Sequence, residues 1–292
     1  MRRSFLFVPG DSRRKLEIAA DTDADALIID LEDSILPSRR PGARDTAAGF
    51  LASHGDRNVW VRINPLDTED ALNDLRSVMP AGPAGIVLPK PRGVKDAIQL
   101  AKSLDVFEQE SGLPQGRTQI MPIATERPAE LFRLHEYIGA TPRLAALTWG
   151  AEDLSTALGA SNSRDEEGDW LPPYQLARSL CLIAASAAVI PAIDTVFTDY
   201  KDTEGLTRYA ERARRDGFSG MLAIHPDQVD PINDAFMPSN KEIDRAKRIV
   251  ELFAENPEAG TLGMDGEMID RPHWVQAKRI LDIAEQKNKV TR

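Results

Sequence analysis

The sequence predicts a (β/α)₈ barrel, the TIM barrel, with a C-terminal helical lid extension, and three observations lead to this prediction. Short apolar runs recur about eight times along the chain, segments with helical spacing lie between them, and the alternation stops after His225-Pro226. Eight parallel strands, each followed by a helix, is the number that closes such a barrel. An open doubly wound sheet gives the same alternation, so the strand count is what favours the barrel.

Each apolar run is rich in Val, Ile, Leu or Phe and is closed by a polar residue, Gly or Pro, as expected of buried parallel strands. Two intervening segments have apolar stripes at helical spacing, Val94-Ala97-Ile98-Ala101-Leu104 and Leu176-Leu180-Ile183-Ala184-Ala187, which we expect to pack on the outside of the barrel. The expected strands are Ser4–Val8, Ala26–Asp30, Val59–Asn64, Gly85–Lys90, Gln119–Thr125, Leu144–Trp149, Ala192–Phe197 and Gly220–His225.

The last part of the chain differs from the rest. We expect a barrel domain over residues 1–237 and a helical extension over residues 238–292. In the extension, apolar residues from Ile243 to Phe253 predict a long amphipathic helix, a turn-rich stretch with three glycines spans 256–266, and a terminal helix begins near Pro272. We interpret this tail as a hinged lid over an active site, its own or that of an adjacent subunit.

Composition excludes several classes of partner. Lys and Arg total 36 against 46 Asp and Glu, a net charge of −10, which repels nucleic acids. The first apolar run ends at Pro9-Gly10, too soon for a signal peptide or a membrane span, so we expect a cytoplasmic protein. The single cysteine, Cys181, lies in an apolar run and is expected to be buried; one cysteine builds neither a disulfide framework nor a Cys-based zinc site.

Charged side chains gather where the predicted strands end, which in this fold is where catalytic groups lie. One such residue is explained by helix capping or solvation. Several acids and bases on one rim are costly unless they bind a cation and an anion, and carboxylates without clustered histidines favour magnesium or manganese. The residues are Asp11, Asp30, Glu32, Asp33, Arg62, Asn64, Lys90, Glu126, Arg127, Glu152, Asp153, Asp194, Asp199 and His225.

Three familiar motifs are missing from the sequence. It contains no Gly-x-Gly-x-x-Gly after a strand, no P-loop lysine and no Gly-x-Ser-x-Gly. These motifs mark dinucleotide redox chemistry, nucleotide hydrolysis and serine hydrolases. The sequence therefore gives no support to those three functions.

At the strand ends the sequence resembles the citrate lyase β subunits, malyl-CoA lyases and related CoA-ester lyases, a family similar to the metal-dependent HpcH/HpaI aldolases. The resemblance covers nearly the whole chain. Its matching stretches are Ser-Phe-Leu-Phe-Val-Pro-Gly-Asp at 4–11, Asp-Ala-Leu-Ile-Ile-Asp-Leu-Glu-Asp at 25–33, Val-Arg-Ile-Asn-Pro at 61–65, Gly-Ile-Val-Leu-Pro-Lys at 85–90, Gly-Ala-Glu-Asp-Leu at 150–154, Ala-Ile-His-Pro at 223–226 and Gly-Glu-Met-Ile-Asp-Arg-Pro at 266–272.

The resemblance implies a set of catalytic roles. It makes Glu126 and Asp153 the ligands of magnesium, which chelates the keto or hydroxy acid end of the substrate. It makes Arg62 the group that stabilises the thioester enolate, and Asp270 an acid/base delivered to the adjacent subunit, with capping of the terminal helix as the alternative for Asp270. It also implies a homotrimer or a dimer of trimers.

The resemblance further implies contacts with the CoA thioester. Basic residues of the first loop, Arg13, Arg14 and Lys15, are expected to hold CoA phosphates at a helix start, with plain solvation as the alternative. The other expected substrate or CoA contacts are Asp30, Glu32, Asn64, Lys90, Gly150, Ala151 and Glu152.

Two departures from the family bear on the pocket. Many members have Glu-Thr at the end of the fifth strand, whereas this chain has Thr125-Glu126. Neighbouring strand residues point to opposite faces, so a real shift requires a local kink to aim Glu126 inward. The acidic insertion 164–170 after the sixth strand is expected to reshape the pocket mouth.

The leading hypothesis is a reversible Claisen-type lyase that cleaves a malyl-, citramalyl-, methylmalyl- or citryl-CoA type thioester. The products are acetyl-CoA or propionyl-CoA and a keto acid such as glyoxylate, pyruvate or oxaloacetate. A free-standing chain favours a CoA ester over an acyl carrier protein. Two alternatives stay open, a CoA-independent pyruvate-type aldolase and a non-catalytic CoA-ester-binding protein.

Overall fold

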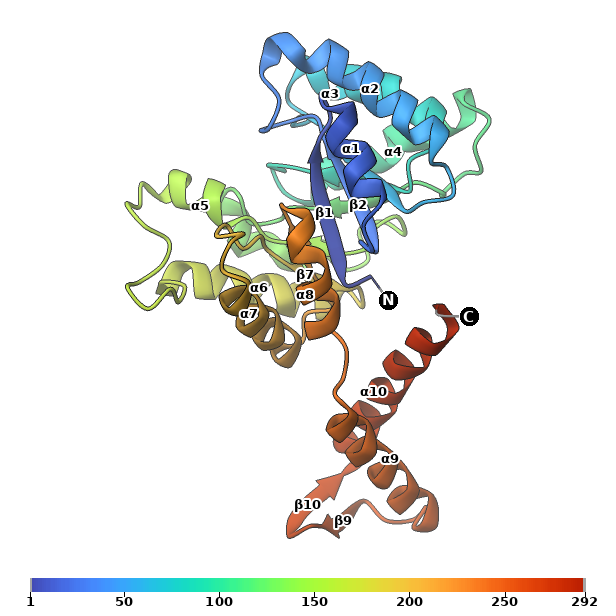
Figure 1. Cartoon of the computed structure of the whole chain (residues 1–292), viewed down its shortest axis with the longest axis vertical. Helices are drawn as coiled ribbons and strands as arrows, with labels where there is room; N and C mark the ends of the chain where they lie inside the picture. The colour runs from blue at the N-terminus through green and yellow to red at the C-terminus, as the bar shows by residue number, and fades with distance from the viewer. Residues whose placement is uncertain (1, 291–292) are drawn as a thin grey trace. The chain divides into compact units, whose positions relative to one another are not determined.

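Eight parallel strands form a single sheet in the computed structural model, which describes residues 2–290 (Figure 1). Neighbours in the sheet follow the order β5-β4-β3-β2-β1-β8-β7-β6. The strands are β1 (Ser4–Pro9), β2 (Ala26–Asp30), β3 (Val59–Arg62), β4 (Gly85–Leu88), β5 (Gln119–Pro122), β6 (Leu147–Thr148), β7 (Ala192–Asp194) and β8 (Gly220–Ala223).

The two end strands of this order, β5 and β6, meet and nearly close the barrel. Parallel bridges join Ile120 to Leu144 and Ile123 to Thr148, and the Ala124 N–H donates to the Thr148 carbonyl over 2.8 Å. The predicted barrel is therefore confirmed. Seven of the eight strands begin at the predicted residue, and most end earlier than predicted because their last residues leave the ladder to form loops.

Helices follow the strands on the outside of the barrel (Figure 1). The connection after β5 is the 3₁₀ helix η3 (Pro128–Tyr137) instead of an α-helix. The α-helices up to residue 235 are α1 (Arg13–Ala20), α2 (Arg40–Ser53), α3 (Glu69–Val78), α4 (Val94–Glu110), α5 (Ala151–Leu158), α6 (Pro172–Ala187), α7 (Thr203–Asp216) and α8 (Val229–Ala235), and the shorter 3₁₀ helices are η1 (Pro37–Arg39), η2 (Met79–Ala81) and η4 (Pro226–Gln228).

Helix α6 turns a different face to the barrel from the one predicted. Leu176 and Ile183 are 57% and 63% exposed. The buried side consists mainly of small residues, which let the helix approach the strands closely, and it carries Arg178 to the buried carboxylate of Asp194. Cys181 is fully buried on this side, as predicted. The predicted stripe of α4 is buried except for Ile98, which is partly exposed.

The barrel interior is filled by large apolar side chains, and Gly85 makes room for one of them. A Cβ atom added at Gly85 would lie 2.3 Å from a ring atom of Trp60, far inside contact distance. Trp60 is itself 1% exposed and packs edge-on against Phe5, with ring centroids 6.2 Å apart. The core around them includes Ile28, Val87, Met121, Ile193 and Leu222.

The chain divides into two compact units, 2–233 and 234–292. The second contains α9 (Asn240–Glu255), β9 (Thr261–Met264), β10 (Glu267–Asp270) and α10 (Arg271–Val290), around a small core that includes Phe253 and Ile269. The strands form an antiparallel hairpin where only a turn-rich stretch before the terminal helix was expected from the sequence. Asp265-Gly266 turns the hairpin with φ of 52° and 81°, and Asp-Gly is the sequence signal for such a turn.

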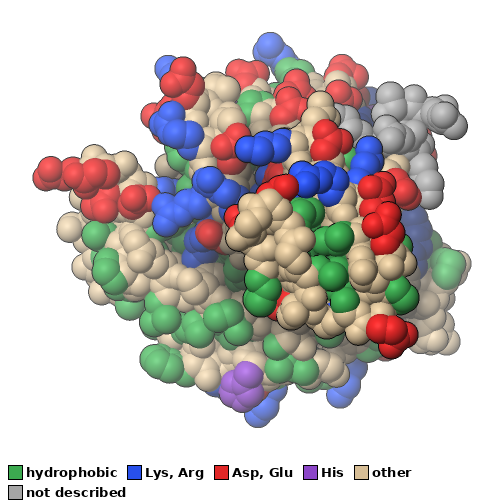
Figure 2. Space-filling view, turned by 90° about the horizontal axis from the view of Figure 1, so that it is seen from below, with side chains coloured by type: hydrophobic (Ala, Val, Ile, Leu, Met, Phe, Trp, Pro, Cys, Tyr) green, Lys and Arg blue, Asp and Glu red, His purple; other side chains and the backbone are tan. Residues whose placement is uncertain are grey.

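The surface mixes charges of both signs. Figure 2 shows acidic and basic side chains interspersed on the face that it draws, with hydrophobic side chains exposed between them. No helix among the described residues is long and apolar enough to cross a membrane.

The packing at Gly85 makes a prediction about stability. We expect Gly85→Ala to lower the free energy of unfolding by about 1–3 kcal/mol, because the new methyl group overpacks the core against Trp60. Gly49→Ala in α2 is the matched control, because nothing lies within 4 Å of its added Cβ; it should stabilise the protein by about 0.5–1 kcal/mol. Urea denaturation of both variants tests this, and equal stability of the two would contradict it.

Candidate active site

A cavity of about 350 Å³ opens at the carboxyl ends of the barrel strands. Its walls come from most of the strands and the loops after them, with an apolar side and a side rich in charged groups. The lining residues are Phe7, Val8, Pro9, Asp30, Asp33, Ser34, Arg62, Ile123, Glu126, Trp149, Gly150, Ala151, Glu152, Asp153, Thr195, Val196, Leu222 and Ile224.

Arg62 and Asp30 form the first pair of this site. They end adjacent strands and stand opposite each other in the parallel register of β2 and β3. The guanidinium donates two hydrogen bonds of 2.7 Å to the carboxylate, and it lies over the Phe7 ring at 4.8 Å. Burial acts to raise the pKa of Asp30, but the charge and hydrogen bonds of Arg62 outweigh it and hold the pKa below its ordinary value.

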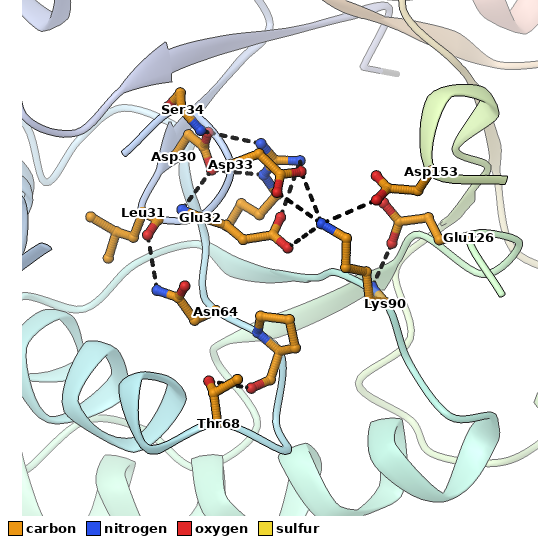
Figure 3. Close-up of polar contacts among 12 residues, drawn as sticks. Asp30, Leu31, Glu32, Asp33, Ser34, Asn64, Thr68, Lys90, Glu126 and Asp153 are labelled. Atoms are coloured by element: carbon orange, nitrogen blue, oxygen red, sulfur yellow. Dashed lines mark hydrogen bonds and ion pairs between the residues drawn. The ribbon is translucent and has the colours of Figure 1, made fainter. Parts of the chain in front are cut away.

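Glu32, from the loop after β2, contacts two cations, Lys90 and Arg62. Its carboxylate accepts a 2.6 Å hydrogen bond from the Lys90 ammonium and lies 3.3 Å from the Arg62 guanidinium. The ammonium also contacts Asp33 at 2.9 Å (Figure 3). Glu32 is 3% exposed, and burial, together with repulsion from Asp33, raises its pKa to about 7 despite both cations.

Glu126 and Asp153 form a second acidic group on the opposite side of Lys90 (Figure 3). Asp153 lies in the first turn of α5, and its carboxylate is 3.3 Å from the Lys90 ammonium. The Lys90 backbone N–H donates to Glu126, which is 4% exposed. Burial first, and then the negative charge of Asp153, raises the pKa of Glu126 well above its ordinary value.

The backbone around Glu126 leaves the strand geometry before this residue. β5 ends at Pro122, so strict alternation no longer decides which way Glu126 points, and its side chain lines the cavity. The Thr125 hydroxyl faces elsewhere and accepts a hydrogen bond of 3.1 Å from the Gly150 N–H. Gly150 is needed here, because an added Cβ would lie 2.7 Å from Glu126 Cγ.

The donor set suits a hard divalent cation. Two carboxylates face one cavity, one of them deeply buried beside the other, and such a pair is stabilised by a cation held through oxygen. Among the described residues, no cluster of three or more Asp, Glu, His or Cys is arranged to hold a metal. The remaining coordination positions would therefore belong to a substrate or water, as is common for Mg²⁺.

Asn64 was expected to contact the substrate or CoA, but it is not among the residues that line the cavity. Its side chain is fully buried and donates to the Leu31 carbonyl at 2.9 Å and to Asp74 at 2.8 Å. The Asn64 N–H also donates to Asp74, at 2.7 Å. Asn64 therefore braces the loops that follow β2 and β3, which carry Glu32 and the residues after Arg62.

The predicted CoA contacts divide into two groups. Gly150, Ala151 and Glu152 line the cavity at the start of α5. The basic side chains at residues 13–15 are exposed in the first turn of α1, outside the cavity lining, and Arg13 lies 3.6 Å from Glu17. Backbone N–H groups at a helix start and three cations together favour an anion.

Asp270 ends β10 in the second unit. Its carboxylate accepts a hydrogen bond of 3.4 Å from the His273 backbone N–H, which caps α10, and it lies 2.5 Å from His273 Nδ1. This ring contact lowers the pKa of Asp270. The capping alternative is thus confirmed, and it is compatible with an acid/base role.

Trp149 was missed as a site residue, although it ends a predicted strand. Its ring lines the cavity with no exposed area, and its indole N–H donates to Asp194 over 2.6 Å. Asp194 also accepts from Arg178 at 2.7 Å, so this strand-end carboxylate positions the pocket wall. An aromatic residue at a strand end, next to the Gly-Ala-Glu-Asp stretch, was the available signal.

Comparison with known proteins gives a consistent result. A family model described as HpcH/HpaI aldolase/citrate lyase matches residues 3–226. The citrate lyase subunit beta of Haemophilus influenzae is 33% identical, with 97% of each chain covered, and the (3S)-malyl-CoA thioesterase of Cereibacter sphaeroides is 33% identical over 97% of this chain and 94% of its own. The structure of CitE from Mycobacterium tuberculosis in complex with magnesium, acetoacetate and coenzyme A has a TM-score of 0.82 and 31% identity, covering 97% of this chain and 98% of its own.

The buried Glu32 makes a prediction about pH. Its pKa of about 7 in the folded protein exceeds its ordinary value of 4.5. At a pH between these two values, the protein therefore takes up a proton when it folds. Wild type should then lose stability relative to Glu32→Gln as the pH rises from 4.5 to 7.5, by roughly 2–3 kcal/mol. Urea unfolding of both proteins across this range measures the difference, and a difference that stays constant would contradict the assignment.

Proposed function

The chain is a member of the HpcH/HpaI aldolase/citrate lyase family, a family of carbon–carbon lyases, and from this premise we propose that it is a magnesium-dependent lyase of CoA thioesters. The substrate is the thioester of a small hydroxy-dicarboxylic acid, and the products are an acyl-CoA and a keto acid. The observation that carries the proposal is the cavity that combines the Glu126–Asp153 pair with the positively charged Arg62.

Glu126 and Asp153 would hold the magnesium ion. When bound, the ion supplies a Lewis acid that binds and polarises the oxygens of the hydroxy acid end of the substrate. The protein places these two carboxylates on the wall formed by the β5 loop and the start of α5. Ala151 and Glu152, in the same helical turn, line the space beside this end of the substrate.

Arg62 acts at the other end of the breaking bond. Cleavage begins when the hydroxyl group gives its proton to an acid/base; the bond between the hydroxyl carbon and the thioester α-carbon then breaks, and its electron pair forms the thioester enolate. The Arg62 guanidinium is held by two hydrogen bonds to Asp30, so its charge is fixed before the enolate oxygen becomes negative. The α-carbon then takes up a proton to give the acyl-CoA.

Asp270 is the proposed acid/base, and it would donate the proton that the thioester α-carbon takes up. The contact with His273 keeps its carboxylate oriented at the end of β10. In the proposed enzyme the unit 234–292 is a lid that delivers Asp270 to the pocket of an adjacent subunit in a homotrimer or a dimer of trimers. Closure would exclude water and bring the carboxylate within reach of the thioester α-carbon.

CoA binding is assigned to the first turn of α1. Arg13, Arg14 and Lys15 present three cations in the first turn of a helix, next to the Pro9 end of the cavity lining. This arrangement matches the negative charge of CoA phosphates.

Hydrolysis of the thioester is the second candidate function. It is favoured by the similarity to (3S)-malyl-CoA thioesterases, which cover 97% of this chain. In that reaction water attacks the thioester carbonyl, CoA leaves, and the carbon skeleton stays intact. The free acid and CoA are therefore diagnostic of a thioesterase.

The experiment is incubation of the purified protein with malyl-, citramalyl-, β-methylmalyl- and citryl-CoA, with and without Mg²⁺, followed by mass spectrometry. An acyl-CoA and a keto acid that form only with Mg²⁺ support the lyase. Free hydroxy acid and CoA support the thioesterase. Thermal stabilisation by a CoA ester without product indicates a binding protein, and cleavage of a hydroxy acid that lacks CoA indicates an aldolase.

Asp153→Ala tests the metal site. We expect it to abolish Mg²⁺-dependent turnover and to weaken Mg²⁺ binding measured by isothermal titration calorimetry, because one of two protein ligands is lost. The fold should be retained, since Asp153 is partly exposed in the first turn of α5. Full activity and unchanged metal affinity in this variant would contradict the assignment.

Asp270→Ala tests the acid/base and its delivery between subunits. We expect turnover to fall by about 100-fold or more while Mg²⁺ affinity is unchanged. When Asp270→Ala and Asp153→Ala chains are unfolded together and refolded, mixed oligomers should recover activity, because some pockets then combine an intact metal site with a neighbour's intact Asp270. Mixtures as inactive as their components would contradict sharing between subunits.

A further inference from the structure

Lys90 connects the two acidic groups of the pocket. Its ammonium lies 2.6 Å from Glu32 and 2.9 Å from Asp33 on one side and 3.3 Å from Asp153 on the other (Figure 3). Its backbone N–H donates to Glu126. One residue therefore contacts both carboxylates assigned to the metal and both acids of the β2 loop.

The backbone of Lys90 is fixed independently of its charge. Its φ is 46°, in the left-handed region that non-glycine residues rarely occupy. The N–H bonds Glu126, and the carbonyl accepts a 2.9 Å hydrogen bond from Arg127 Nε. Such a conformation is strained and persists only where surrounding contacts determine it. The ammonium is thus directed between the acids by the fold.

The charges around Lys90 do not balance. Five carboxylates, those of Asp30, Glu32, Asp33, Glu126 and Asp153, face the two cations Arg62 and Lys90. When all five carboxyl groups are ionised they outnumber the two cations, and this excess of negative charge favours a further cation. Both oxygens of Asp30 accept hydrogen bonds from Arg62. Lys90 is the cation that contacts both the acids of the loop after β2 and the Glu126–Asp153 pair.

We propose that Lys90 is an internal cation that competes with magnesium for Asp153. Its ammonium and a divalent ion both require this carboxylate and repel each other. Glu32 and Asp33 already lie 2.6 and 2.9 Å from the ammonium, so it keeps these two partners when the metal takes Asp153. Lys90 thus sets the metal affinity of the site. This inference rests on the proposed function in taking Glu126 and Asp153 as metal ligands.

A purely structural role for Lys90 predicts the opposite sign. If the ammonium only held Asp153 in place for the metal, its removal would disorder the carboxylate and weaken Mg²⁺ binding. Competition predicts tighter binding once the positive charge is gone. Metal affinity therefore separates the two roles, whereas turnover falls in both cases, because the anionic substrate also loses a cation.

The test is the Mg²⁺ dissociation constant of the full chain, measured by isothermal titration calorimetry without substrate. Lys90→Met and Lys90→Asn both remove the charge, and Asn tolerates the left-handed backbone. We expect both to bind Mg²⁺ about tenfold more tightly than wild type. Lys90→Arg should bind like wild type, and so should Lys95→Met, which removes a charge from an exposed site in α4. Thermal melting confirms that each variant is folded.

Glu32→Gln provides a second arm. Weakening the contact between Glu32 and the Lys90 ammonium should hold the ammonium more firmly on Asp153, so Mg²⁺ should bind less tightly. This effect should shrink in the Glu32→Gln/Lys90→Met double variant. Affinity that is unchanged or weaker in both charge-removing variants overturns the inference while leaving the metal site of the proposed function intact. Absence of Mg²⁺ binding in wild type and in both variants overturns the inference and the magnesium assignment together.

Discussion

The active-site rim depends on one constraint, which is that buried carboxylates must be neutralised. Asp30, Arg62, Glu32, Lys90 and Asp153 form a chain of alternating charge in which each neighbour lies within 3.3 Å. Removing Arg62 from this chain would leave the buried carboxylates of Asp30 and Glu32 without the cation that they share, which typically costs several kcal/mol. The chain therefore fixes the geometry of the loops after β2, β3 and β4 and of the first turn of α5.

Buried acid–arginine pairs also support the barrel behind this rim. Asp194 holds Arg178 of α6, Asp74 holds Arg44 of α2, and Glu108 holds Arg143, each carboxylate having no exposed area. Asp74 also binds Asn64, and Asp194 also binds Trp149. Through Asp74 and Asp194, the outer helices α2 and α6 are thus connected to residues at or near the cavity.

In the proposed reaction the two ends of the charge chain have different tasks. Asp153 and Glu126 bind the end of the substrate that becomes the keto acid, and Arg62 stabilises the end that becomes the enolate. Glu32 and Lys90 lie between them and couple the two halves electrostatically. A change of charge at one end therefore alters the electrostatic environment of the other end. This coupling suits the proposed enzyme, which binds a cation and an anion in adjacent positions.

The sequence alone determined the barrel, because apolar runs and helical stripes follow from local periodicity. It also identified the charged strand ends, since parallel strands bring their carboxyl ends to one rim. It could not assign Asn64 or Asp194, because whether a strand-end side chain enters the cavity or braces a loop depends on contacts with distant residues such as Asp74 and Arg178. Only the tertiary structure decided which face of α6 is buried, how the chain turns before Glu126, and that Lys90 lies between two acidic groups. Each of these depends on packing and charge between segments far apart in the chain, which local sequence does not encode.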